Sequence, residues 1–213
     1  MKSASRGRPA NPEKQVEQKM KLITAAADLL SKQSYRSITI RQLGEQAGVN
    51  SAMIRYYFDN KQGLFIALLD EMSTHHFAEM KTVFQSDNPI KSFIHTMLTM
   101  LNHNPGLALM LHDEVLQQDS EIKSAFIERF PKRMAKVLPQ LIQQQISAGR
   151  LRSNLNPKYA AFSLMGSIVF PFLATPIREE AWEIKSLELA QPEWVEHIYN
   201  LFMMGTSSEK TCD

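Results

Sequence analysis

The segment GVNSAMIRYYFDNK, residues 48–61, concentrates hydrogen-bond donors and aromatic rings more than an ordinary solvated helix does. It holds an arginine, two adjacent tyrosines and a lysine within fourteen positions. Arginine can donate two parallel hydrogen bonds to the edge of a guanine, whereas lysine and tyrosine can donate to phosphate oxygens. These residue types predict contact with a nucleic acid, provided that one surface presents them together.

Two short helices on either side of Gly48 could form that surface. The first opens with Thr39 and Gln42, which have the spacing of a capping box. Its inward residues are predicted to be Ile40, Leu43 and Ala47. Upstream, a longer helix is expected from Pro12 to about Gln33, because apolar residues recur on one helical face. The residues of that face are Val16, Met20, Ile23, Ala27 and Leu30.

A tight, glycine-containing turn between two short helices predicts a helix-turn-helix, whose second helix lies in the major groove of DNA. Arg55 is the candidate for a bidentate contact with guanine, and Ala52 or Met53 for contact with a thymine methyl group. Spacing alone leaves open a plain helical hairpin with a solvated face. The predicted DNA contacts are Thr39, Arg41, Asn50, Ser51, Ala52, Met53, Arg55, Tyr56, Tyr57 and Lys61.

Residues 39–65, TIRQLGEQAGVNSAMIRYYFDNKQGLF, resemble the DNA-binding signature of the TetR family of bacterial transcriptional regulators. Three positions depart from the family pattern, namely Ser34, Met53 and Arg55, and they bear on which bases are read. The resemblance implies a homodimeric, sequence-specific regulator, expected to be a repressor that a small-molecule effector releases from a palindromic operator. The matching positions are Thr39, Ala47, Gly48, Val49, Tyr57, Phe58 and Lys61.

Charge is unevenly distributed along the 213 residues. Residues 1–63 hold eleven Lys and Arg against five Asp and Glu, whereas residues 64–213 are net acidic. We therefore expect a basic DNA-binding domain over 1–63 and a second domain over 64–213. Arg6 and Arg8, in SRGRP, could enter an A·T-rich minor groove. A solubilising tail is an equally good interpretation of that arm.

The larger domain completes an all-α fold: its helices are predicted at 89–103, 105–118, 121–148, 157–173 and 192–204. The family resemblance implies that it binds a small apolar or amphipathic effector, and its flexible and flat apolar residues suit such a pocket. Ordinary core packing would also explain them. Candidate pocket residues are Met97, Met100, His103, Met110, Glu114, Phe126, Phe130 and Met165. Candidate dimer-interface residues are Trp194, Ile198, Leu201 and Phe202.

Other functions fit the sequence less well. The histidines and carboxylates lack metal-ligand spacing, and neither a glycine-rich phosphate loop nor a nucleophile elbow occurs, so no enzyme, metal or cofactor is expected. The single cysteine, Cys212, and the polar amino terminus favour a cytoplasmic location. The uncharged run 159–177 contains two prolines and favours a buried helix over a membrane span. A helical protein-interaction adaptor with only non-specific DNA binding is the alternative function.

Overall fold

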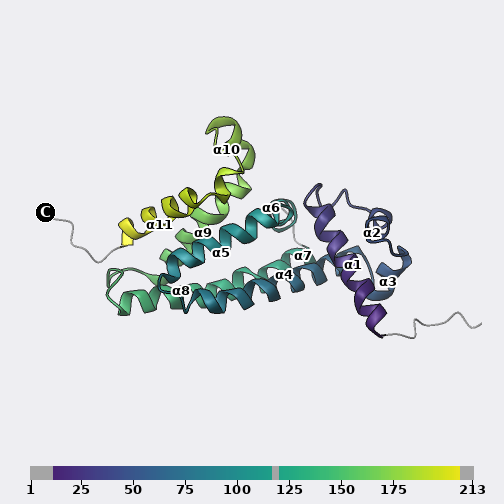
Figure 1. Cartoon of the computed structure of the whole chain (residues 1–213), viewed down its shortest axis with the longest axis horizontal. Helices are drawn as coiled ribbons and strands as arrows, with labels where there is room; N and C mark the ends of the chain where they lie inside the picture. The colour runs from purple at the N-terminus through teal and green to yellow at the C-terminus, as the bar shows by residue number, and fades with distance from the viewer. Residues whose placement is uncertain (1–11, 117–119, 207–213) are drawn as a thin grey trace, which may run out of the picture.

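The computed structural model describes residues 12–116 and 120–206, and these are predominantly helical (Figure 1). Helices α1–α3 form a small head at one end, and α4–α11 form the longer body. The head comprises α1 (Pro12–Leu30), α2 (Ile40–Ala47) and α3 (Ala52–Phe58). The body comprises α4 (Lys61–Val83), α5 (Pro89–His103), α6 (Pro105–Met110), η1 (Leu111–Leu116), α7 (Glu121–Arg129), α8 (Pro131–Ser147), α9 (Pro157–Leu173), α10 (Thr175–Ala181), η2 (Glu188–Ala190) and α11 (Pro192–Thr206).

Local hydrogen bonds set the ends of the helices in the head. The Thr39 hydroxyl accepts from the Gln42 backbone N–H while the Gln42 side chain accepts from the Thr39 N–H, which confirms the predicted capping box. Gly48 ends α2 with φ 61°, in the left-handed region that glycine enters without a steric penalty. Asn60 caps α4 by accepting from the backbone N–H of Gly63. The turn and both caps therefore follow from residues next to one another in the sequence.

The prediction for the inward face of α1 was correct near its carboxyl end and wrong near its amino end. Leu30 is buried and Ile23 and Ala27 pack against the core, whereas Val16 and Met20 are 64% and 42% exposed. The covered face continues towards the amino terminus through half-buried polar residues, of which Gln18 holds a hydrogen bond to α3. Because the amino-terminal half of the covered face is polar, the periodicity of apolar residues pointed to a stripe of α1 next to the face that is really covered. Ile40, predicted to face inward from α2, is exposed as well.

Helix α4 joins the head to the body. It is continuous from Lys61 to Val83 and packs against α1 and α3 at its beginning and against α5 and α7 further along. Its 23 residues span about 35 Å at the usual helical rise. The expected domain boundary at residue 63 thus falls within the first turn of this helix, so a shift of α4 moves both parts of the molecule.

Two predicted helices of the body are interrupted. The helix expected at 105–118 runs as α6 only to Met110 and continues as the π-helix η1. The helix expected at 121–148 was predicted to be interrupted or bent at Pro131 and Pro139: it breaks at Phe130, Pro131 begins α8, and α8 continues through Pro139. Wider π-helical turns occur in proteins mostly at functional sites. In this chain η1 lies in the part of the body that meets the head.

Head and body also approach each other closely at the start of α6. A Cβ atom added to Gly106 would lie 2.3 Å from the backbone oxygen of Leu30, the last residue of α1. Only glycine allows two backbones to come this close, so any side chain at position 106 would push α6 away from the head. Movement of α6 is therefore transmitted to α1 through rigid backbone.

Helix α9 runs from Pro157 to Leu173, as predicted, with Pro171 within its last turn. Within the described residues, no helix by itself has the length and apolar content of a membrane span. Helices α9 and α10 meet that test only as a pair, with a bend of 73° between them.

Candidate nucleic-acid interface and ligand core

Helix α3 exposes one face and buries the other. Ile54 is fully buried beneath the helix, whereas Ala52, Arg55 and Tyr56 are exposed. The Asn50 side chain accepts from the backbone N–H of Ala52 at 2.9 Å and so stabilises the first turn. Of the remaining predicted contacts, Ser51 and Met53 are half-buried. The accessible face of α3 thus offers a guanidinium, a phenol and a methyl group, the types of group that read base edges and phosphates.

The amino-terminal end of α2 adds two predicted contact residues. Thr39 is exposed, but its hydroxyl already interacts with Gln42. Arg41 is also exposed, and its Nε donates to Oε1 of Glu45 at 2.8 Å on the helix surface. Such an exposed pair contributes little stability, so Arg41 can exchange Glu45 for a phosphate. Arg6 and Arg8 fall outside the described residues.

Tyr57 does not have the phosphate-donating role that we predicted. Its hydroxyl donates to Oε1 of Gln18 at 2.8 Å, and its ring lies 5.5 Å from the ammonium nitrogen of Lys19. A phenol has one O–H, so it cannot donate to Gln18 and to a phosphate at once. Tyr57 instead fixes α3 against α1, and Tyr56 is the tyrosine that remains exposed.

Lys61 is likewise held by the protein, and its predicted phosphate contact, for which one N–H is left, stays a prediction. Its ammonium donates to the backbone oxygens of Tyr35 and Ile38, both at 2.9 Å, and lies 4.2 Å from the centre of the Tyr35 ring. Burial lowers the pKa of Lys61, and the charge of Glu114 acts in the opposite direction. Lys61 thus closes the connector between α1 and α2 onto the start of α4.

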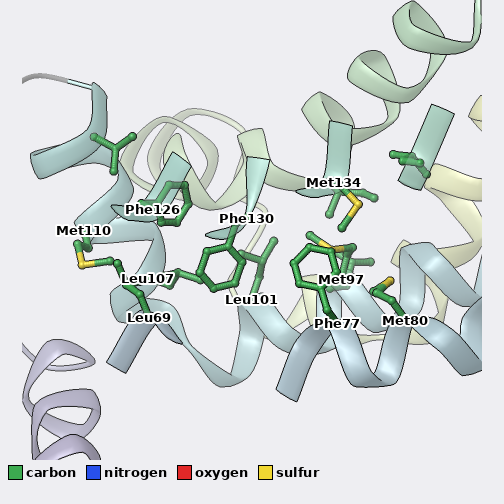
Figure 2. Packing of buried hydrophobic residues seen from close by; sticks show 14 of the residues in the cluster. Leu69, Phe77, Met80, Met97, Leu101, Leu107, Met110, Phe126, Phe130 and Met134 are labelled. Carbon is green, nitrogen blue, oxygen red and sulfur yellow. The ribbon is translucent and has the colours of Figure 1, made fainter. Parts of the chain in front are cut away.

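Half of the predicted pocket residues meet in the core of the body. Met97, Met110, Phe126 and Phe130 are all buried, and Figure 2 shows them in a row with side chains from α4, α5, α6 and α8. The residues of α4 in this row reach from Leu69 to Met80, about 16 Å along the helix. We name this row the apolar column: Leu69, Phe77, Met80, Met97, Leu101, Leu107, Met110, Phe126, Phe130 and Met134.

The other predicted pocket residues lie elsewhere. Met100 and Met165 are half-buried at the edge of the core. His103 is exposed, and its Nδ1 lies 2.7 Å from the Thr99 backbone oxygen, so it was wrongly assigned to a pocket. Two surface grooves are lined by none of the predicted pocket residues; the larger, of about 650 Å³, includes Lys91 and His95.

Glu114 was also wrongly assigned to the ligand pocket. It is buried in η1, and its Oε1 accepts from Nε of Arg36 at 2.8 Å. Arg36 belongs to the connector between α1 and α2, so this ion pair joins the body to the head. A buried carboxylate needs such a partner because its desolvation is otherwise uncompensated. Glu114 also raises the pKa of Tyr35, after the larger effect of burial.

Sequence reasoning missed a polar residue beside the apolar column. His76 on α4 is 2% exposed, and its ring lies 5.3 Å from that of Phe77 and 6.4 Å from that of Phe130. Its Nδ1 is buried and has no hydrogen-bond partner. Burial lowers the pKa of His76 to about 4, so the ring is neutral at pH 7. From the sequence, the adjacent histidines His75 and His76 were tested only as metal ligands and rejected. In the structure the ring of His75 points outward and that of His76 points inward.

Comparison with known proteins identifies the head. Residues 22–68, which include α2, α3 and the start of α4, match the family model of bacterial regulatory proteins of the tetR family. The chain thus carries the amino-terminal domain of tetR-family regulators. It is 24% identical over 193 residues to the uncharacterised HTH-type transcriptional regulator YvkB of Bacillus subtilis, which covers 89% of this chain and 97% of that protein.

Two further comparisons concern fatty acids or their derivatives. The fatty acid metabolism regulator protein of Bacillus subtilis is 24% identical over 155 residues, covering 70% of this chain and 78% of that one. The crystal structure of the transcriptional regulator FadR from Bacillus subtilis in complex with stearoyl-CoA superposes with a TM-score of 0.73 at 19% identity, covering 87% of this chain and 98% of that one. The likeness to that structure establishes a shared fold along the body as well as the head.

The body carries an exposed apolar face on its last long helices. Phe162 on α9 is 81% exposed and Leu201 on α11 is 61% exposed, and α9 and α11 pack against each other. Tyr159, Phe170 and Met204 on the same two helices are exposed too. Of the predicted interface residues, only Leu201 is exposed. Ile198 is buried within its own chain, and Trp194 and Phe202 are half-buried against the same core.

Replacing Arg55 tests the exposed face of α3. We expect Arg55→Ala to relax base selectivity and to weaken operator binding by about 1–3 kcal/mol, because a base-edge contact is lost. Binding of matched and single-base-changed duplexes, measured by fluorescence anisotropy, would show this. Arg152→Ala, which removes an exposed arginine from the body, is the control for net charge. Unchanged selectivity in the Arg55 variant would rule out base contact by this residue.

The low pKa of His76 predicts a pH-dependent stability. Because the unfolded ring takes up a proton near pH 6.5 and the folded ring only near pH 4, stability falls as the pH drops through this window. Glu79, on the same helix, opposes this shift, whereas Arg133 of α8 and His75 reinforce it. The loss reaches about 3 kcal/mol. Urea unfolding at several pH values should show a shallower decline for His76→Phe than for the wild type, and equal slopes would contradict it.

Proposed function

We propose that the protein is a homodimeric repressor that an amphipathic small molecule with a long apolar chain releases from an inverted-repeat operator. The observation that carries this proposal is the course of α4, which is anchored in the head by Lys61 and lines the apolar column with Phe77 and Met80. A ligand that changes the packing of the column must act on this helix. The same helix determines where α3 is held.

The exposed apolar face supports the dimer. Aromatic residues and methionine are typical of interface cores, and large apolar side chains on two packed helices favour burial against a second copy. A two-fold dimer would bring two α3 helices to successive major grooves, about 34–36 Å apart. We therefore assign Tyr159, Phe162 and Phe170 of α9, with Leu201 and Met204 of α11, to the dimer interface.

The ligand class follows from the shape of the apolar column and from the relatives. A row of apolar side chains about 16 Å long suits an extended chain better than a compact ring system. A protein of the same fold binds stearoyl-CoA, and a relative of similar length regulates fatty acid metabolism. We infer that the effector of this chain is a long-chain acyl compound, of which an acyl-CoA is the first to test.

Two contacts would carry the effector's influence to the head. The Arg36–Glu114 ion pair and the Gly106–Leu30 approach both connect the α6–η1 segment with the end of α1 or the connector after it. A ligand shifts the equilibrium only as far as it prefers the state that does not bind DNA, so a 100-fold preference amounts to about 2.7 kcal/mol. The two contacts must move together if ligand binding in the body is to change DNA binding by the head to this extent.

Selection of bound duplexes from a random DNA pool at near-physiological salt tests the proposal. We expect enrichment of an inverted repeat, and loss of its binding when palmitoyl-CoA is added. Retention of DNA without an enriched motif would favour the alternative of an adaptor with only non-specific DNA binding. An enriched motif whose binding is indifferent to palmitoyl-CoA would retain the regulator and reject the acyl effector.

The ion pair between head and body can be tested separately. We expect Arg36→Ala to lower the free energy of unfolding by about 1–3 kcal/mol, because Glu114 loses a cation while remaining buried. It should also reduce the change in operator affinity that palmitoyl-CoA causes. In the Glu114→Gln background the same arginine substitution should cost less, which a double-mutant cycle measures.

Lys21→Ala, which removes the exposed Lys21–Glu17 pair of α1, is the matched control and should change stability by less than about 0.5 kcal/mol. Equal effects of Arg36→Ala in both backgrounds would mean that the pair does not couple head and body.

A further inference from the structure

The unpartnered nitrogen of His76 is unusual for its position. Of three buried side-chain nitrogens without a hydrogen-bond partner among the described residues, those of Gln33 and Trp194 belong to half-buried side chains. His76 alone of the three is almost wholly buried, at the edge of the apolar column. A buried polar group without a hydrogen-bond partner destabilises the folded protein, so its presence calls for an explanation.

Two aromatic rings and a guanidinium lie near His76. Its ring contacts Phe77 and Phe130 of the column. Arg133 of α8 is close enough for its charge to act on His76. The Arg133 guanidinium lies 3.8 Å from the centre of the Phe77 ring, and one of its nitrogens lies 3.4 Å from the hydroxyl of Ser73. Ser73, His76 and Phe77 share one face of α4, since they are three and four residues apart. Ser73 and His76 are both buried, so this face of α4 carries two polar side chains beside Phe77 of the column.

The segment that contains Arg133 is rich in basic residues. From Lys123 to Lys136, over most of α7 and the start of α8, it contains five basic residues and one acidic residue. Lys132 pairs with an exposed carboxylate of Glu128, and such an exposed pair is weak and can exchange for phosphate, whereas Arg129 is only 24% exposed and binds Asp70 through two nitrogens. Beside the apolar row there is therefore one unpartnered hydrogen-bonding atom, with a basic segment close to it.

We propose that Nδ1 of His76 binds the carbonyl group of a long-chain acyl thioester, whose chain occupies the apolar column and whose anionic carrier lies on the basic segment of α7 and α8. This proposal rests on the function proposed above and names the group of the ligand that is recognised. Neutral imidazole carries one proton, and with that proton on Nδ1 the N–H donates to the carbonyl oxygen. The positive potential of Arg133 favours the same oxygen.

A pair of ligands that differ only at the carbonyl tests this assignment. Palmitoyl-CoA has the thioester, whereas S-hexadecyl-CoA has the same chain length and carrier but no carbonyl. We expect the wild-type protein to bind palmitoyl-CoA about 3- to 10-fold more tightly than the thioether, the range of one neutral hydrogen bond. Isothermal titration calorimetry on the full chain measures both affinities.

Variants of His76 then locate the interaction. His76→Phe should bind the two ligands with equal affinity and should be at least as stable as the wild type at pH 7, because it removes an unpartnered polar atom from the core. His76→Asn, whose amide N–H₂ can occupy the position of Nδ1, should restore part of the preference. His75→Phe, on the exposed side of the same helix, should keep the full preference. Thermal melts establish that each variant is folded.

The outcomes separate this proposal from the proposed function. If palmitoyl-CoA releases the operator but the thioether does so equally well, or if His76→Phe keeps the preference, the assignment of His76 is wrong and the acyl-responsive repressor stands. If the wild type binds neither ligand, both the assignment and the acyl effector are wrong. Only a preference for the thioester that disappears in His76→Phe and persists in His75→Phe supports the proposal.

Discussion

The buried carboxylate of Glu114 is the constraint on which the arrangement of head and body depends. A charge removed from water must be compensated, and here the compensating cation, Arg36, comes from the other part of the molecule. The connector that carries Arg36 also supplies two backbone oxygens to Lys61 of α4. Arg36 is thus paired with η1, and Lys61 is paired with the connector. The head is consequently held by directed polar contacts and by α4, rather than by a broad apolar interface alone.

This arrangement explains why two residues of the DNA-binding signature face inward. Tyr57 ties α3 to α1 through Gln18, and Lys61 ties the connector to α4. Both fix the orientation of α3, whereas Arg55 and Tyr56 are left to meet the nucleic acid. A motif can therefore be identified correctly from its sequence even though some of its residues serve to position others. In this head the exposed residues of α3 are few, so each has a large share in selectivity.

Much of the head could be predicted because its determinants are local. The Thr39–Gln42 capping box, the turn at Gly48 and the Asn60 cap each involve residues within a few positions of one another. The Arg36–Glu114 pair joins residues 78 positions apart, and no sequence pattern signals it. The face of α1 was misassigned at its amino end because polar glutamines occupy that half of it. His76 was overlooked because the orientation of a histidine depends on how α4, α7 and α8 pack, which periodicity alone does not give.

The exposed phenylalanines of α9 have a consequence for the whole regulator. If they are covered only by a second copy, the number of assembled molecules falls with the square of the free-chain concentration once that concentration is below the dissociation constant. Dilution of the protein as a cell grows and divides would then lower occupancy of the target more steeply than in proportion. Abundance would act as a second input alongside the small molecule, and the strength of the apolar contact would set the expression level at which control begins.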